Sequence, residues 1–182
     1  MRTDTDRFTL RSGVVGDLDT LGEIDADAGG LFEQAGLFLD LPETHEFPMA
    51  ERRRWRDCLA ARTTLIALDS VSGPVGFAAI GRKDGDAYLA QLSVRQRCMR
   101  RGIGSALLEA AAEMASAIGA GALWLTTYDH LAWNRPFYER HDFVVMPEIA
   151  CGPEMLAEHA FEKKWLPLPG ERVVMCRTLR AR

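Results

Sequence analysis

The sequence lacks any long apolar run. No stretch approaches the roughly 18 consecutive apolar residues that a membrane-spanning helix needs. The first ten residues, MRTDTDRFTL, carry acidic side chains where a signal peptide would have its apolar centre. These absences argue against a membrane protein and favour a cytoplasmic location.

Cysteine is scarce as well, since the chain has only Cys58, Cys98, Cys151 and Cys176. The spacings of 40, 53 and 25 residues contain none of the close pairs that bind zinc. We therefore expect reduced thiols and no metal site. Cys98 lies beside arginines, but its position favours ordinary packing over a reactive thiol.

An excess of positive charge is also missing. The net charge is −4 and the isoelectric point is near 5.6, whereas a dedicated nucleic-acid-binding domain is usually basic. A length of 182 residues, with 47% hydrophobic and 26% charged residues, is typical of one globular domain. We expect a single domain over residues 1–182, with a core at 7–146 and a C-terminal part at 147–182.

The hydrophobic patterns alternate between strand and helix periods along the chain. We expect strands at 7–11, 63–69, 75–80, 87–94, 122–126, 143–146 and 172–178, and helices at 18–28, 49–61, 104–118, 133–140 and 153–164. Gly29-Gly30 is expected to interrupt the first helix, and Asp84-Gly85 to form a hairpin turn. This mixture predicts an α/β (mixed α+β) fold.

The stretch RQRCMRRGIGSALL, residues 95–108, places four arginines and two glycines between a strand and a helix. A helix N-terminus presents unpaired N–H groups and partial positive charge, so this loop is suited to a phosphate. It lacks the lysine of a nucleotide-binding P-loop, and it lacks the third glycine and the later acid of a dinucleotide fingerprint. A loop for a different phosphate ester and a plain solvated turn remain.

Two segments resemble the GNAT superfamily of acetyl-CoA-dependent N-acetyltransferases. LSVRQRCMRRGIGSALL is similar to the family's strand–loop–helix segment, and WNRPFYERHDF to its second motif, N-x-x-F-Y-x-x-x-G-F. The resemblance implies a central, mostly antiparallel mixed sheet of about six to seven strands flanked by helices. Met99 stands at the usual Gln/Arg position and Asp142 at the usual Gly.

The resemblance also implies roles for individual residues. Strand residues Leu92, Ser93 and Val94 would meet the pantetheine amides, and an N–H near Leu92 would polarise the acetyl carbonyl. The pyrophosphate would be ringed by Met99, Arg100, Arg101, Gly102, Ile103, Gly104 and Ser105. Asn134 would hydrogen-bond the pantetheine arm with Phe137 alongside, and Tyr138 would be the general acid.

The general base is left open. Making an alkylamine neutral at pH 7 requires about 4–5 kcal/mol, because its pKa is near 10.4. Many family members use a carboxylate on the strand before the loop, but Ala90 and Gln91 cannot accept a proton there. The alternatives are Glu33, His45, Glu46, Asp129, His130, or a water positioned by Gln91.

The sequence thus predicts an N-acetyltransferase that moves the acetyl group of acetyl-CoA directly to a primary amine of a small molecule, peptide or protein. The alternative is a non-catalytic acyl-CoA-binding sensor or interaction module. We expect no nucleic-acid partner, no membrane association, and a monomer or homodimer. The identity of the acceptor cannot be read from the sequence.

Overall fold

The computed structural model describes residues 8–179, so the expected strand start at Arg7 lies outside the described part. It contains a seven-stranded sheet with strand order β1-β2-β3-β4-β5-β7-β6. Every neighbouring strand pair with a described register is antiparallel except β4 and β5. The predicted mixed α/β class with a mostly antiparallel sheet is therefore confirmed. The chain divides into two compact units, which are described in turn.

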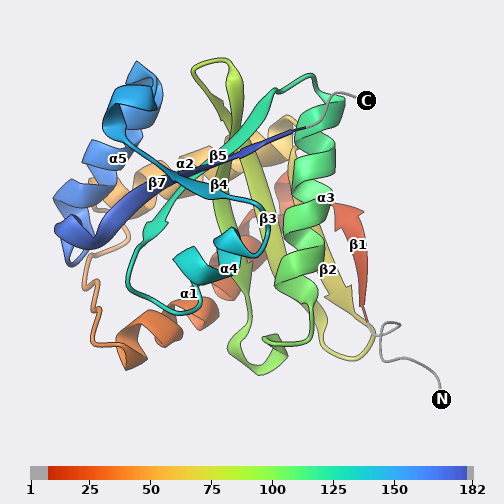
Figure 1. Ribbon diagram of the computed structural model, residues 1–182. Coiled ribbons are helices and arrows are strands. Elements are labelled where there is room, and N and C mark those ends of the chain that lie inside the picture. Colours follow the sequence, from red (N-terminus) through yellow and green to blue (C-terminus); the bar gives the residue numbers. More distant parts are fainter. Residues whose placement is uncertain (1–7, 180–182) are drawn as a thin grey trace. The chain divides into compact units, whose positions relative to one another are not determined.

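The first unit comprises Met1–Gly36, Leu41–Gly81 and Ala90–Ala111. Its strands are β1 (Phe8–Ser12), β2 (Thr64–Asp69), most of β3 (Gly73–Lys83) and the second half of β4 (Asp86–Val94). β1 pairs with β2, and β2 with β3, both antiparallel, so the three strands lie side by side (Figure 1).

Helix α1 (Leu18–Gln34) contradicts one expectation, because it runs unbroken through Gly29-Gly30. A helical glycine costs only about 1 kcal/mol relative to alanine, and the buried face formed by Leu21, Ile24 and Ala28 holds the helix in place. Gly30 also has a packing role. A Cβ there would lie 2.5 Å from Gln96 Nε2.

Helix α2 (Glu46–Ala60) begins three residues before the expected start. His45 caps it, with Nδ1 accepting a hydrogen bond of 3.2 Å from the Phe47 N–H. Pro48 is tolerated because it lies in the first turn, where no intrahelical donor is needed. Trp55 on α2 packs edge-on against Phe77 of β3, with ring centroids 5.6 Å apart.

After β4 the chain forms a short 3₁₀ turn, η3 (Gln96–Cys98), and then helix α3 (Ile103–Ala117). In the first unit α3 buries Leu107, Leu108 and Ala111 completely. It packs closely on the sheet at Gly76, where a Cβ would lie 3.0 Å from the Ser93 carbonyl oxygen and 3.2 Å from Leu107 Cδ1. The predicted strand–loop–helix segment is confirmed.

The second unit comprises Leu37–Asp40, Arg82–Leu89 and Ala112–Arg182. β5 (Ala122–Tyr128) pairs antiparallel with β7 (Arg172–Thr178) along its whole length, and β6 (Val144–Met146) covers the other edge of β7 (Figure 1). β4 pairs parallel with β5 at Ala87–Leu123 and Tyr88–Trp124. The remaining elements are η2 (Val15–Asp17, first unit), α4 (Arg135–Glu139), η4 (Glu148–Ala150), α5 (Pro153–Trp165) and η5 (Pro169–Glu171).

Helix α5 turns charged side chains inward. Glu162 pairs with Arg172 of β7 at 2.5 Å, and Glu158 pairs with Lys83 at 2.9 Å. Both glutamates are buried, so each charge is held by a partner that offsets its lost hydration. Within residues 8–179, no helix is long and apolar enough to cross a membrane.

Candidate functional site

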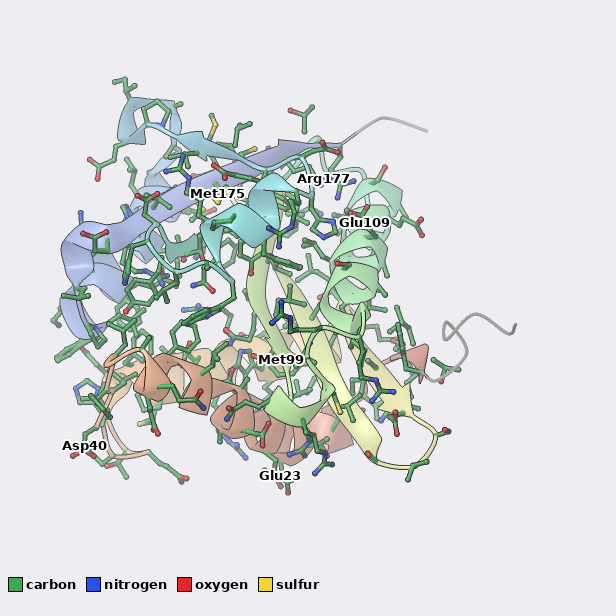
Figure 2. The ribbon with its side chains drawn as sticks, turned by 60° about the horizontal axis from the view of Figure 1, so that its bottom comes forward. Glu23, Asp40, Met99, Glu109, Met175 and Arg177 are labelled. Carbon is green, nitrogen blue, oxygen red and sulfur yellow. The ribbon has the colours of Figure 1, made fainter. Side chains whose placement is uncertain are left out.

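The predicted phosphate loop lies in the first unit, between the end of β4 and the first turn of α3. Figure 2 shows Met99 on this connection. Gly102 has φ of +81° and Arg100 has φ of +60°, so the chain turns sharply just before the helix. The Ala106 N–H donates to the Gly102 carbonyl at 3.0 Å as the first helical bond. The N–H groups of Ile103 and Gly104 lie at the helix start, where intrahelical acceptors are lacking.

The loop is held by α1 through Gln96. The Gln96 backbone N–H donates to Asp27 Oδ2 at 2.7 Å, and its Nε2 donates to the Asp27 carbonyl, also at 2.7 Å. Gln34 Nε2 donates to Gln96 Oε1 at 2.8 Å. The Met99 N–H donates to the Gln96 carbonyl at 3.2 Å, so this N–H forms part of the turn itself.

The four loop arginines differ in what they bind. Arg101 pairs with Asp69 at 2.8 Å, and Arg95 donates to the Pro74 carbonyl at 3.2 Å and contacts Glu23 at 3.4 Å. Hydrogen bonds from the Ser72 N–H and from Arg101 hold the pKa of Asp69 at about 2. Two of the four guanidinium groups are thereby committed to the fold.

Arg97 and Arg100 are exposed, and the described part of the chain contains no ion pair for either. Exposed cations beside a helix N-terminus and a glycine turn are chemically suited to the phosphates of coenzyme A. The residues of this loop therefore fit the predicted cofactor, acetyl-CoA. Residues 8–179 contain no cluster of side chains able to bind a metal ion.

Strand β4 carries the predicted pantetheine residues Leu92, Ser93 and Val94, with Ser93 and Val94 buried. Beside them lies a residue that the sequence reasoning missed. Asp25 of α1 accepts hydrogen bonds on Oδ1 from Gln91 Nε2 at 2.6 Å and from Ser93 Oγ at 2.7 Å. Burial raises the pKa of Asp25. No local pattern marks this aspartate, since its partners are 66 and 68 residues away.

The other predicted residues lie in the second unit. Asn134 precedes α4, and its carbonyl accepts from the N–H groups of Phe137 at 2.9 Å and Tyr138 at 3.1 Å. The Tyr138 ring packs edge-on against Phe137 and Phe143, at 5.2 and 5.7 Å between centroids. Burial raises the pKa of Tyr138 to about 12, so the hydroxyl keeps its proton at neutral pH.

Asp142 explains one departure from the expected motif. Its φ is +63°, in the left-handed region that favours glycine and that aspartate tolerates better than most residues. The turn after α4 is therefore made without glycine. The Phe143 N–H still donates to the Tyr138 carbonyl at 3.2 Å.

Of the five candidate bases, three lie in the first unit and two in the second. Glu33 and Glu46 are exposed on α1 and α2, and His45 caps α2 through Nδ1. In the second unit, Asp129 binds Arg135 at 2.5 Å, and His130 Nδ1 lies 3.6 Å from Glu171. His45, Asp129 and His130 thus each have a partner within their own unit.

Comparison with known proteins gives one family and several similar structures. The family model described as acetyltransferase (GNAT) family matches residues 34–143. PaiA N-acetyltransferase from Thermoplasma acidophilum, solved in complex with coenzyme A, is 17% identical with a TM-score of 0.64, covering 94% of this chain and 98% of that one. The ribosomal-protein-S18-alanine N-acetyltransferase from Escherichia coli is 16% identical with a TM-score of 0.61, covering 96% of each chain.

N-acetylglutamate synthase from Neisseria gonorrhoeae, solved with coenzyme A and N-acetyl-glutamate, is also similar. It is 18% identical with a TM-score of 0.64, and the match covers 95% of this chain but 35% of that one. The chain thus spans about a third of the length of that protein. At such identities the likeness concerns the fold alone.

Proposed function

The chain belongs to the acetyltransferase (GNAT) family, and on this premise we propose that it moves the acetyl group of acetyl-CoA to a primary amine of a small molecule, peptide or protein. The observation that carries the proposal is the loop between β4 and α3. It combines Gly102 at φ +81°, the start of α3, and the exposed Arg97 and Arg100.

The loop would bind and orient the coenzyme A part of acetyl-CoA. Backbone N–H groups at the start of α3, from Gly102 to Ser105, would hold the pyrophosphate, with Arg100 adding charge. The backbone of Leu92 and Val94 would pair with the pantetheine arm as another strand would. Asn134 and Phe137 are the proposed contacts from the second motif.

The chemistry would be direct transfer in a ternary complex. Acetyl-CoA supplies an activated thioester, and the chain's residues need only position the amine and manage protons. Tyr138 is the proposed general acid, because a phenol with a pKa of about 12 is protonated at neutral pH and can donate toward a departing thiolate.

The names of the similar proteins agree with this proposal. They include an enzyme that acetylates an alanine of ribosomal protein S18 and a synthase of N-acetylglutamate, and two of the three structures contain coenzyme A. Their acceptors differ from one another, so they support amine acetylation in general and no particular substrate.

The test has a binding arm and a transfer arm. Acetyl-CoA at 100 times its dissociation constant should stabilise the fold by about 2.7 kcal/mol, and Arg100→Ala should weaken binding more than Arg52→Ala on α2. A panel of primary amines should then release free thiol from acetyl-CoA with a matching N-acetylated product. Absence of binding would refute the proposal. Binding without transfer to any amine would favour the non-catalytic acyl-CoA-binding module.

A further inference from the structure

Asp25 is a half-buried carboxylate held by two neutral donors. Gln91 Nε2 and Ser93 Oγ both donate to Oδ1, at 2.6 and 2.7 Å, and Gln91 Nε2 also donates to Ser93 Oγ at 3.0 Å. The three side chains form a closed hydrogen-bonded cluster, here called the Asp25 cluster. It links α1 to β4 within the first unit.

The cluster contains no cation. The other acids near it in sequence on α1 have partners of their own: Asp19 pairs with Arg52 of α2, Glu23 pairs with Arg95 of the loop, and Asp27 accepts a hydrogen bond from the Gln96 N–H. Among residues 8–179 no ion pair reaches Asp25. A carboxylate removed from water without a partner cation is unfavourable, and burial accordingly raises the pKa of Asp25. A cationic ligand would remove this penalty.

The cluster also lies at the proposed reaction centre. Gln91 and Ser93 flank Leu92, and side chains two apart on a strand point to the same face. The Asp25 carboxylate is thus anchored on both sides of the residue whose N–H is assigned to the acetyl carbonyl. Both hydrogen bonds end on Oδ1, so Oδ2 is the oxygen that we assign to the incoming amine.

We propose that Asp25 binds the ammonium form of the acceptor amine and accepts a proton from it, as the general base of the transfer. This inference rests on the proposed function. The ammonium passes one proton to Oδ2, and the neutral nitrogen forms a C–N bond with the acetyl carbon. The C–S bond then breaks with its electron pair on sulfur, and the thiolate takes a proton from Tyr138. The nitrogen releases its extra proton to water, and Tyr138 regains a proton from water, so that one proton is released overall. Asp25 then returns its proton to water.

The substrate class follows from the same chemistry. A lone carboxylate with neutral neighbours favours an amine that is positively charged at neutral pH, such as an alkylamine or a lysine side chain. An amine that is already neutral at pH 7 does not need the first proton transfer, which is the one assigned to Asp25, so its acetylation should depend little on Asp25.

The experiment compares Asp25→Asn with wild type, and uses Asp19→Asn as the matched control because Asp19 is an exposed carboxylate on the same helix. With an alkylamine at pH 7, Asp25→Asn should lower kcat/KM by about 10²–10⁴-fold. The loss should shrink as the pH rises toward the pKa of the amine. With methoxyamine, which is neutral at pH 7, the variant should stay within a few-fold of wild type. Asp19→Asn should match wild type throughout.

A second readout needs no turnover. Since the pKa of Asp25 is raised in the folded state, its ionisation lowers the stability of wild type as the pH rises above its ordinary value near 3.9. Asp25→Asn should therefore be at least as stable as wild type at pH 7, with unchanged affinity for acetyl-CoA. A structural role would instead give a less stable variant with equal losses for both amines, and that result would overturn the inference.

The outcomes separate the two proposals. Normal transfer by Asp25→Asn at pH 7 would refute the base and leave the acetyltransferase proposal intact. Failure of wild type to acetylate any amine would refute both.

Discussion

Gly76→Ala tests the packing of α3 on the strand that carries the proposed cofactor contacts. The added methyl group would lie 3.0 Å from the Ser93 carbonyl oxygen and 3.2 Å from both Leu107 Cδ1 and Val94 Cγ2. The first neighbour is backbone, and Leu107 is completely buried. The carbonyl oxygen cannot move aside without displacing β4, and the Leu107 and Val94 side chains have little room to rotate because both are buried.

The expected change in the free energy of unfolding follows from two opposing effects. Overpacking a well-packed core destabilises by about 1–3 kcal/mol, while replacing glycine restricts the unfolded chain and returns about 0.4–1 kcal/mol. We expect a net loss of about 1–2 kcal/mol in the free energy of unfolding. With a denaturant slope of about 2 kcal/mol/M, the urea midpoint should fall by about 0.5–1 M.

The assay is urea unfolding followed by tryptophan fluorescence, with Gly29→Ala as the control. A Cβ at Gly29 meets nothing within 4 Å, in the interior of α1, so that variant should gain about 0.5–1 kcal/mol. The two glycine-to-alanine changes thus have opposite expected signs. A Gly76→Ala protein as stable as wild type would show that α3 does not pack on β3 and β4 as described.

Three further predictions concern the site and its support. Tyr138→Phe should lower turnover by about 10²–10⁴-fold with unchanged acetyl-CoA affinity; near-normal turnover with a lower melting temperature would show a packing role. Gly104→Val, in the first turn of α3, should stay folded but lose acetyl-CoA affinity by calorimetry, and normal binding would show that the loop is placed wrongly. Because the pKa of Asp69 is lowered to about 2, the stabilisation from its ionised form should be complete above its ordinary pKa near 3.9 and disappear as the pH falls through 2. The melting temperatures of wild type and Asp69→Asn should therefore converge over that pH range. A difference that stays constant with pH would contradict this prediction.

Much of the fold could be predicted because it depends on local patterns. The Asp84-Gly85 hairpin and the strand–loop–helix segment each follow from a few consecutive residues. The interruption expected at Gly29-Gly30 was wrong for a tertiary reason. Packing of the buried face of α1 outweighs the low helix propensity of glycine. Because Gly30 has no side chain, the Gln96 side chain can pack against it.

The candidate site divides in the same way. The sequence by itself determined that the arginine-glycine loop and the Phe137-Tyr138 pair are candidates, because each is a motif of neighbouring residues. It could not show that Arg101, and not Arg100, pairs with Asp69, since that depends on which strand end lies beside the loop.

Only the tertiary structure decided what the buried charges contact. The buried face of α5 includes two glutamates, Glu158 and Glu162, whose partners come from β3 and β7, and no hydrophobic period predicts their burial. Asp25 is one of several acids on α1, and its contacts with Gln91 and Ser93 arise from the packing of α1 on β4. Local propensity decides on which helix or strand a residue lies. A polar group that loses water on folding needs hydrogen-bond partners, and only the tertiary structure decides which distant residues supply them.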